Sequence, residues 1–501
     1  MKLRVTALSA LLALSACAVG PDFHSPPAPD TQRYTREPLP AATVAASGAG
    51  GDAQRFVSAN TAPRAWWRAF GSSELDRLVD EALQRSPTVD AARSRLIAAQ
   101  EDYRARVGET VLPSVDAGVS ATRRKVDLAS FGLANTTPPP PFTLYDASVN
   151  VTYLLDVFGG NRRVLEGMRA QVDYAAFELD AARLALAGNV VSATIRRASL
   201  RRQLDLTRQL EHAQARQLDI MAHRQMAGGV AELDVRAQRT LLERTRAAIP
   251  PLAAQLAQTE HRLAVLVGLP SARANFSDIA LDELQLPGSL PVTLPSTLAR
   301  ERPDIRASEA LLHRASADVG VATANLFPQF SITASAGSER THIRDILDQF
   351  NVWSLGLSMT QPIFHGGALR AQRRAAQATY DAARADYRET VLQALQQVAD
   401  ALQALQNDAQ ALHARDAASR EAQASLRIAS ERYAAGGISQ FALVDAERQA
   451  LDATLERTKA QADRLADTAA LYQSLGGAML DADDAQVTPD RRARSSSPAQ
   501  N

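Results

Sequence analysis

The alternation of hydrophobic and polar residues predicts four β-strands, arranged as two pairs along the chain. The alternation is clearest over residues 145–156, where six apolar or aromatic side chains share one face: Tyr145, Ala147, Val149, Val151, Tyr153 and Leu155. It returns at residues 353–360, where larger apolar side chains alternate with Ser, Gly and Thr. A period of two is typical of a strand whose two faces meet different environments. We therefore expect β-hairpins at about 112–157 and about 327–363.

A proline-free run follows each predicted hairpin and predicts a helix of unusual length. The first run, residues 161–227, contains 67 residues and ends at Gly228 and Gly229. At 1.5 Å per residue, an unbroken helix of this length measures about 100 Å. A second helix is expected to run back from each glycine pair, and we expect Pro250 and Pro251 to interrupt the first of them. The long helices are thus predicted at about 161–267 and about 368–475.

The spacing of these landmarks indicates an internal two-fold repeat. The distances along the chain agree within one residue between the halves: Gly160 to Gly228 and Gly367 to Gly436 (68 and 69 residues), and Gly229 to Gly268 and Gly437 to Gly476 (39 each). We assign the first repeat to residues 64–290 and the second to 291–480. A Pro- and Ala-rich tether at 17–63 precedes them, and a polar, Ser-rich tail at 481–501 is expected to be disordered.

The composition restricts how this chain can meet a membrane or another macromolecule. The 501 residues carry a formal net charge of zero, so there is no basic footprint for nucleic acid. No run of about 18 apolar residues follows residue 17, so we expect no membrane-spanning helix and any crossing must use strands that close on themselves. Because closure needs about eight strands, a chain with four strands must oligomerise if it spans a bilayer.

The start of the chain predicts export and lipidation. Lys2 and Arg4 precede a short apolar run, which is typical of a secretory signal peptide, here residues 1–16. The ending Leu-Ser-Ala-Cys resembles a bacterial lipobox, which implies a lipid attached to Cys17, and Ala18 resembles the outer-membrane sorting pattern. The alternative is an ordinary signal peptide followed by an incidental cysteine.

No pattern of catalytic or metal-binding residues is present. The sequence lacks Gly-x-Ser-x-Gly, a P-loop and His-Glu-x-x-His. His212 and His223 are eleven residues apart, which is too far for one metal ion on a helix. We therefore expect no enzyme activity, no metal site and no cofactor beyond the covalent lipid at Cys17.

These features together resemble the TolC-type outer membrane factors, and within them the lipoprotein subgroup of resistance–nodulation–division (RND) efflux systems (NodT/OprM-like). The resemblance is carried by the lipobox cysteine with residues 18–23, the repeated strand–helix unit and the paired glycine turns, and it covers residues 17 to about 480. It implies an α+β membrane protein that forms a homotrimer. Four strands from each chain would then form an outer-membrane β-barrel, continuous with a long periplasmic α-helical barrel.

The resemblance also implies partners, a location and a function. The partners are a periplasmic adaptor (membrane fusion protein), an inner-membrane RND pump and outer-membrane lipid, and the location is the outer membrane of a Gram-negative bacterium, lipid-anchored and spanning. The implied function is an exit duct that passes small molecules from the pump–adaptor complex to the exterior. Two alternatives stay open, a duct for type I protein secretion and a periplasmic coiled-coil tether that forms no channel.

A constriction at the helix-hairpin tips is implied next to Gly228, Gly229, Gly436 and Gly437. Tyr433 begins a match to the family's Tyr-x-x-Gly motif, Asp445 lies in a match to its Leu-x-Asp-Ala motif, and Asp234 is the counterpart in the first half. Two positions depart from the pattern. Ala442 stands where some members have a second aspartate, and Ile438 where some have an arginine, so at most one aspartate ring is implied.

A ring of Asp445 carboxylates around a three-fold axis would favour cations, because its negative charge attracts counter-ions. Repulsion between the like charges would raise their pKa values. From the residues alone, the favoured interpretation is that Asp445 and Asp234 are ordinary solvated residues near a helix start.

Overall fold

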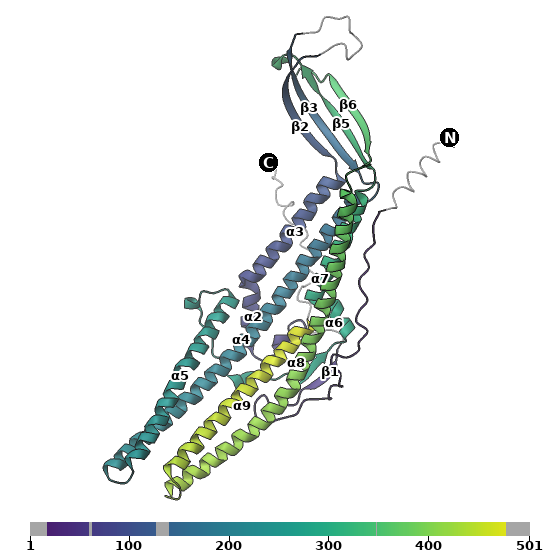
Figure 1. Cartoon of the computed structure of the whole chain (residues 1–501). Helices are drawn as coiled ribbons and strands as arrows, with labels where there is room; N and C mark the ends of the chain where they lie inside the picture. The colour runs from purple at the N-terminus through teal and green to yellow at the C-terminus, as the bar shows by residue number, and fades with distance from the viewer. Residues whose placement is uncertain (1–17, 60–62, 127–139, 347, 477–501) are drawn as a thin grey trace, which may run out of the picture. The chain divides into compact units, whose positions relative to one another are not determined.

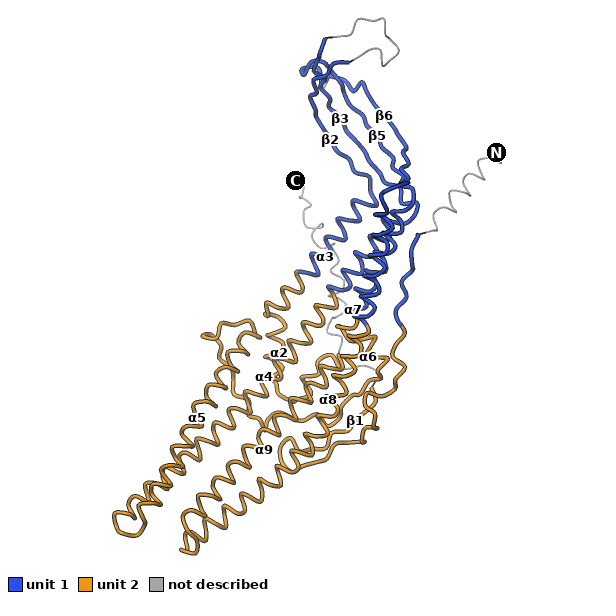
Figure 2. Tube along the Cα trace, in the orientation of Figure 1, with its two compact units in different colours: residues 1–26, 95–175, 308–387 blue, residues 27–94, 176–307, 388–501 orange. Residues whose placement is uncertain are grey.

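The computed structural model describes residues 18–59, 63–126, 140–346 and 348–476. The predicted signal peptide, Cys17 and the tail at 481–501 lie outside these residues. The chain divides into two compact units (Figure 2). Unit 1 takes residues up to 26 together with 95–175 and 308–387, and unit 2 takes residues 27–94, 176–307 and those from 388 onwards.

Unit 1 contains a four-stranded antiparallel sheet in the order β2-β3-β5-β6. The strands are β2 (Ser114–Arg124), β3 (Phe142–Leu155), β5 (Gln329–Arg340) and β6 (Val352–Thr360). A short 3₁₀ turn, η6 (Ile343–Asp345), lies between β5 and β6. The four predicted strands and both hairpins are therefore confirmed, and the sheet joins the hairpin of one half to the hairpin of the other.

The four long helices repeat with equal lengths in the two halves. Helices α4 (Gly160–Met226) and α8 (Ala368–Ala434) have 67 residues each, and α5 (Glu232–Val267) and α9 (Gln440–Leu475) have 36 each. The shorter helices α3 (Pro87–Val111) and α7 (Pro303–Ala324) precede β2 and β5 (Figure 1). Within the described residues, no helix combines the length and the apolar composition needed to cross a membrane.

One detail of the helix prediction is wrong, because α5 continues through Pro250 and Pro251. Each proline removes one backbone donor and leaves a carbonyl of the preceding turn without its usual partner. Both prolines lie at exposed positions, where water can hydrate the freed carbonyls. The helix therefore continues through the two prolines instead of ending there.

The core of unit 2 is built on helix α2 (Ser73–Arg85) and the aromatic 3₁₀ turn before it, η2 (Trp66–Phe70). Ser72 caps α2 by accepting a hydrogen bond from the Leu75 amide at 3.3 Å. Trp66 is buried and stacks on Tyr472 of α9, with ring centroids 5.7 Å apart. Trp66 and Trp67 are both buried and take part in the packing of this core.

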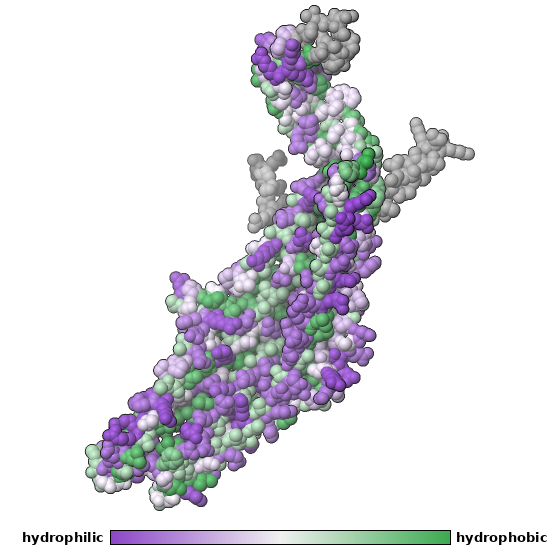
Figure 3. Space-filling view, in the orientation of Figure 1, coloured by the Kyte–Doolittle hydropathy of each residue, from purple (hydrophilic) through white to green (hydrophobic). Residues whose placement is uncertain are grey.

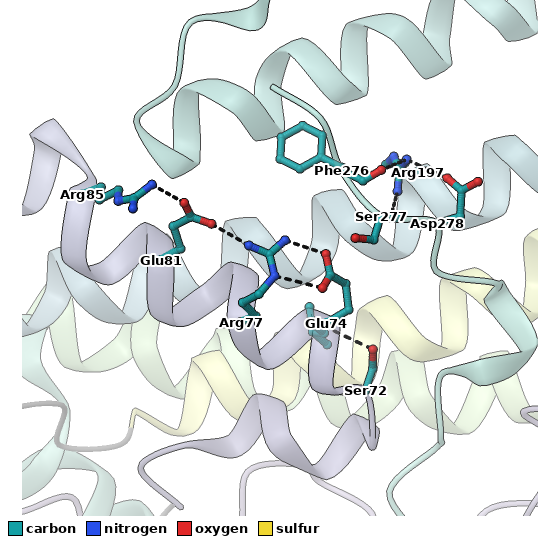
Figure 4. A network of polar contacts seen from close by, with 10 residues as sticks. Ser72, Glu74, Arg77, Glu81, Arg85, Arg197, Phe276, Ser277 and Asp278 are labelled. Atoms are coloured by element: carbon teal, nitrogen blue, oxygen red, sulfur yellow. Dashed lines mark hydrogen bonds and ion pairs between the residues drawn. The ribbon is translucent and has the colours of Figure 1, made fainter. Parts of the chain in front are cut away.

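Within unit 2, Arg197 of α4 holds the connector between the two halves, residues 271–294 (Figure 4). Its buried guanidinium donates to the Glu260 carboxylate (2.9 Å), to the carbonyls of Ser277 (2.8 Å) and Phe276 (3.2 Å), and to Asp278 (3.2 Å). The connector also contains the 3₁₀ turns η4 (Ser271–Arg273) and η5 (Leu281–Glu283) and the strand β4 (Ser289–Val292), and the short helix α6 (Pro295–Glu301) follows it.

Part of the predicted tether packs against helices α8 and α9 instead of standing free. Strand β1 (Arg55–Ser58) pairs in parallel with β4, an arrangement that alternation does not predict because each strand has only four residues. Arg464 of α9 is fully buried and donates to Thr43 Oγ1 (2.9 Å) and to the carbonyls of Gly50 (3.0 Å) and Asp52 (2.7 Å). We call residues 41–58 the strap.

Candidate functional site

The four-stranded sheet has one apolar and one polar face, and the pairing register makes both faces continuous. One row across the sheet contains Val115, Val151, Ala334 and Leu355, and the adjacent row contains Asp116, Asn150, Ser335 and Ser354. Successive residues of a strand point to opposite faces, so the apolar rows lie on one face and the polar rows on the other. The alternation predicted for each strand separately is thus aligned between neighbouring strands.

The apolar face is open to its surroundings in the single chain. Trp353 is 80% exposed and Leu355 is 70% exposed, and Val119, Leu357 and Met359 are exposed as well. Soluble monomers rarely expose large contiguous apolar patches. This face therefore fits contact with lipid or another apolar partner.

Hydroxyl pairs connect neighbouring strands on the polar face. Ser331 lies 2.7 Å from Ser358, and Ser335 lies 2.7 Å from Ser354, each measured between the hydroxyl oxygens. On β3, the Ser148 hydroxyl donates to the Asp146 carboxylate at 3.0 Å. A face of this composition remains compatible with water.

The two outer strands leave open backbone edges. In the part of the chain that the structure describes, β2 pairs only with β3, and β6 pairs only with β5. Each outer edge presents backbone N–H and C=O groups that can accept a further strand. One of the two edges comes from each sequence repeat.

The long helices of both halves end in the same turn. The Gly229 amide donates to the Arg224 carbonyl and the Gly437 amide to the Arg432 carbonyl, both at 2.8 Å. Gly228 and Gly436 have φ angles of 77° and 74°, which side-chain-bearing residues rarely adopt. This is the Schellman arrangement, and it places the four predicted tip glycines immediately after α4 and α8.

Apolar side chains are exposed around these helix ends. Met226, Leu233 and Phe441 are 77%, 76% and 76% exposed, and Figure 3 shows apolar surface at the ends of both helix pairs. Near the same ends, the Gln217 side chain of α4 donates to Gln440 of α9 at 3.2 Å. The two helix pairs are therefore joined by a polar contact close to their tips.

The predicted gate residues lie near the tips but do not contact one another. Asp234 and Tyr433 are half-buried, in the first turn of α5 and the last turn of α8. Among the described residues, no hydrogen bond or ion pair joins Asp234, Tyr433 and Asp445. The closing network left open by Ala442 and Ile438 is not formed by these three residues within one chain.

Asp445 instead has local partners on its own helix. Its carboxylate accepts hydrogen bonds from Arg448 (2.9 Å) and from Gln449 (2.6 Å). The Arg448 hydrogen bond is the main reason that the pKa of Asp445 is lowered. The sequence motifs do not single out Arg448, although its i+3 spacing from Asp445 is a signal for such a pair.

A second group of carboxylates lies between α8 and α9, away from the predicted gate residues. The pKa of Asp408 is raised to about 7, first by burial and then by the hydrogen bond and the negative charge of Asp467. Asp463 raises it further, and Arg464 lowers it. Asp408 Oδ2 is buried and has no hydrogen-bond donor among the described residues. The pKa of Asp408 is thus raised toward neutrality, with Asp467 as its neighbour.

Comparison with protein families gives a match in two segments. Residues 78–269 and 294–477 match the family model described as outer membrane efflux protein. One segment falls within each predicted repeat. The match covers most of the chain.

Individual relatives match over nearly their whole length. The pyoverdine export outer membrane protein OpmQ of Pseudomonas putida is 30% identical, over 88% of this chain and 94% of the relative. The solvent efflux pump outer membrane protein SrpC, also of Pseudomonas putida, is 29% identical, over 95% of this chain and 98% of the relative. Among solved structures, the outer-membrane channel OprN is similar with a TM-score of 0.80 at 29% identity, over 92% of this chain and 99% of OprN.

The raised pKa of Asp408 predicts a pH-dependent stability. Between the ordinary aspartate pKa of 3.8 and the raised pKa of about 7, the folded protein holds a proton that the unfolded chain has lost, so the free energy of unfolding falls as pH rises through this window. Asp408→Asn imitates the protonated carboxyl and cannot lose a proton. We expect the drop in Tm between pH 5 and pH 8 to be smaller in this variant than in wild type, by about 2 °C or more, when both are measured by calorimetry.

Asp381→Asn, at an exposed position of α8, is the matched control and should keep the wild-type pH dependence. Identical pH profiles for Asp408→Asn and wild type would contradict the prediction.

Proposed function

The chain belongs to the outer membrane efflux protein family, and we propose that it works as a homotrimeric exit duct in a tripartite efflux system. The predicted TolC-type resemblance is confirmed by the two-segment family match. The protein is an outer-membrane channel of an efflux system in a Gram-negative bacterium and not an enzyme. The proposal adds three features: the trimer, the periplasmic adaptor with its inner-membrane RND pump, and the passage of small molecules to the exterior.

The observation that carries the proposal is the two-faced sheet with an open edge at each side. An unpaired backbone N–H or C=O costs several kcal/mol in lipid, so both edges need partner strands. Edge pairing of β6 in one copy with β2 in the next satisfies this demand. Three copies supply twelve strands, above the roughly eight needed to close, with the apolar face outward and the polar face lining the passage.

The family decides against the coiled-coil tether, since its members are channels. For the cargo, the relatives' names refer to pyoverdine export and to solvent efflux, both of which concern small molecules. We therefore favour small-molecule efflux over type I protein secretion.

We propose that the duct is anchored by lipid at Cys17 and gated at the helix tips. Asp445 would form one ring, with Arg448 as its neutralising partner in each copy. The preference of the duct for cations over anions would then depend on how far Arg448 neutralises the Asp445 carboxylates. Asp234, Tyr433 and the glycine turns would take part in closing through contacts between copies.

Because the sheet has one apolar and one polar face, we expect an added charge to be tolerated on the polar face only. Leu355→Arg puts a guanidinium on the apolar face, which costs about 2–4 kcal/mol near the middle of a bilayer. Ser354→Arg, one residue earlier, puts the same group on the polar face. We expect Leu355→Arg to reduce strongly the amount of protein recovered in the outer-membrane fraction, whereas Ser354→Arg should stay close to wild type. Equal recovery of both variants would contradict the assignment of the faces.

We expect substitutions at Asp445 and Arg448 to change the ion selectivity of the channel in opposite directions. Asp445→Asn removes the ring charge and should lower the cation-to-anion permeability ratio by about twofold or more, which corresponds to only ~0.4 kcal/mol per ion. Arg448→Gln releases the Asp445 carboxylate from its partner and should raise the ratio. The measurement is the reversal potential of single channels in planar bilayers under a salt gradient.

Glu232→Gln is the matched control, because it removes one exposed negative charge from the start of α5. It should leave the permeability ratio near wild type. Unchanged selectivity in Asp445→Asn would remove Asp445 from the gate.

A further inference from the structure

The first described residues of the chain are bound to unit 1 at the turn between β3 and α4. The Val19 amide donates to the Phe158 carbonyl at 3.0 Å. Arg163, near the start of α4, donates to the Asp22 carboxylate at 2.7 Å and to the carbonyls of Val19 (3.4 Å) and Gly20 (3.5 Å). Residues 19–23 therefore contact the body through both backbone and side chains.

The groups that hold this peptide are themselves fixed by two helices. The Arg163 side chain is only 6% exposed and also donates to Glu166 at 2.7 Å. The other Glu166 oxygen lies 2.9 Å from His313 Nε2 of α7. The His313 ring stacks on Phe23, with centroids 4.3 Å apart and planes 13° apart. The peptide thus contacts α4 and α7, and these two helices also contact each other through Glu166 and His313.

Glycines on both sides allow the backbones to approach closely. A Cβ atom on Gly159 would lie 2.7 Å from the Ala18 Cα, and a Cβ atom on Gly20 would lie 2.5 Å from the Gly320 Cα of α7. A Cβ atom on Gly320 would also meet the Arg163 side chain at 2.7 Å. The surface and the peptide therefore match in shape as well as in charge.

We propose that Arg163, Glu166 and His313 form a receptor for the chain's own N-terminal peptide, residues 19–23, and that this receptor fixes where the N-terminal anchor leaves the folded body. We call it the N-terminal seat. Burial of the guanidinium supports a built site, since a charged group removed from water needs several partners and the peptide supplies three of them.

The seat limits how far a lipid on Cys17 can lie from the folded body. This part of the inference rests on the proposed lipid at Cys17. Only Ala18 separates Val19 from Cys17, so the reach of the chain limits the distance between these two positions to about 7 Å. Because the strap holds residues 41–58, the segment left free without the seat would be residues 17–40, with an r.m.s. end-to-end distance of about 27 Å. The seat therefore turns a loose tether into a short one and holds the helix-side end of the sheet near the membrane surface.

Hydrogen exchange of the full-length protein in detergent, followed by mass spectrometry of the peptide containing residues 18–24, tests the seat. Asp22→Lys reverses the charge that faces Arg163 and changes an exposed residue, so folding is preserved. Gly320→Leu fills the slot where Gly20 and Arg163 meet α7. We expect exchange in this peptide to become at least tenfold faster in both variants.

Asp30→Lys is the matched control, with the same charge change at an exposed position of the same segment, and its exchange should remain at the wild-type rate. Wild-type exchange in both seat variants would overturn the proposal. Single-channel conductance of the wild-type protein tests the exit duct separately, so failure of one idea is distinguishable from failure of the other.

Discussion

The rest of the structure depends on one constraint. The backbone N–H and C=O groups at the two open edges of the sheet need hydrogen-bond partners. Strand β2, from the first repeat, forms one edge and β6, from the second, forms the other. Pairing between these different edges is head-to-tail, and head-to-tail contacts form rings when the rotation between copies closes. The repeat thus gives every chain one edge of each kind, which is what a closed ring of identical chains requires.

The two helix pairs end in the same turn, yet they differ in how firmly the returning helix begins. Ser439 caps α9 by accepting a hydrogen bond from the Ala442 amide, whereas Ala231 offers no side-chain cap to α5. A missing cap costs a helix start about 1 kcal/mol. Each helix start carries an ion pair, Asp445 with Arg448 on α9 and Glu232 with Arg236 on α5. The side-chain cap is therefore a difference between the two starts that the ion pairs do not share.

The sequence predicts those parts of the fold that leave a periodic or local signal. The strands were visible because their two faces differ, and the long helices because proline is absent between the glycine pairs. The Gly228 and Gly436 turns were visible because the left-handed conformation favours glycine. The predicted break at Pro250 and Pro251 was wrong, since an exposed helix surface tolerates a missing backbone hydrogen bond.

The parts that depend on distant contacts left no such signal. The strap is held by Arg464, more than 400 residues from Gly50, and the N-terminal seat joins Asp22 to Arg163 across 141 residues. The pairing of β1 with β4 involves strands too short to show alternation. At the candidate site, motif position placed Asp445, Asp234 and Tyr433 near the helix ends correctly. Their partners follow from side-chain geometry, and only Arg448 could have been found from spacing.

The most direct measurement of the central claim is single-particle imaging of the detergent-extracted, full-length protein. We predict a three-fold particle with a hollow axis, in which β6 of each chain pairs with β2 of the next and Trp353 and Leu355 face outward. A monomer with free strand edges, or a solid helical rod without an axial passage, would contradict it.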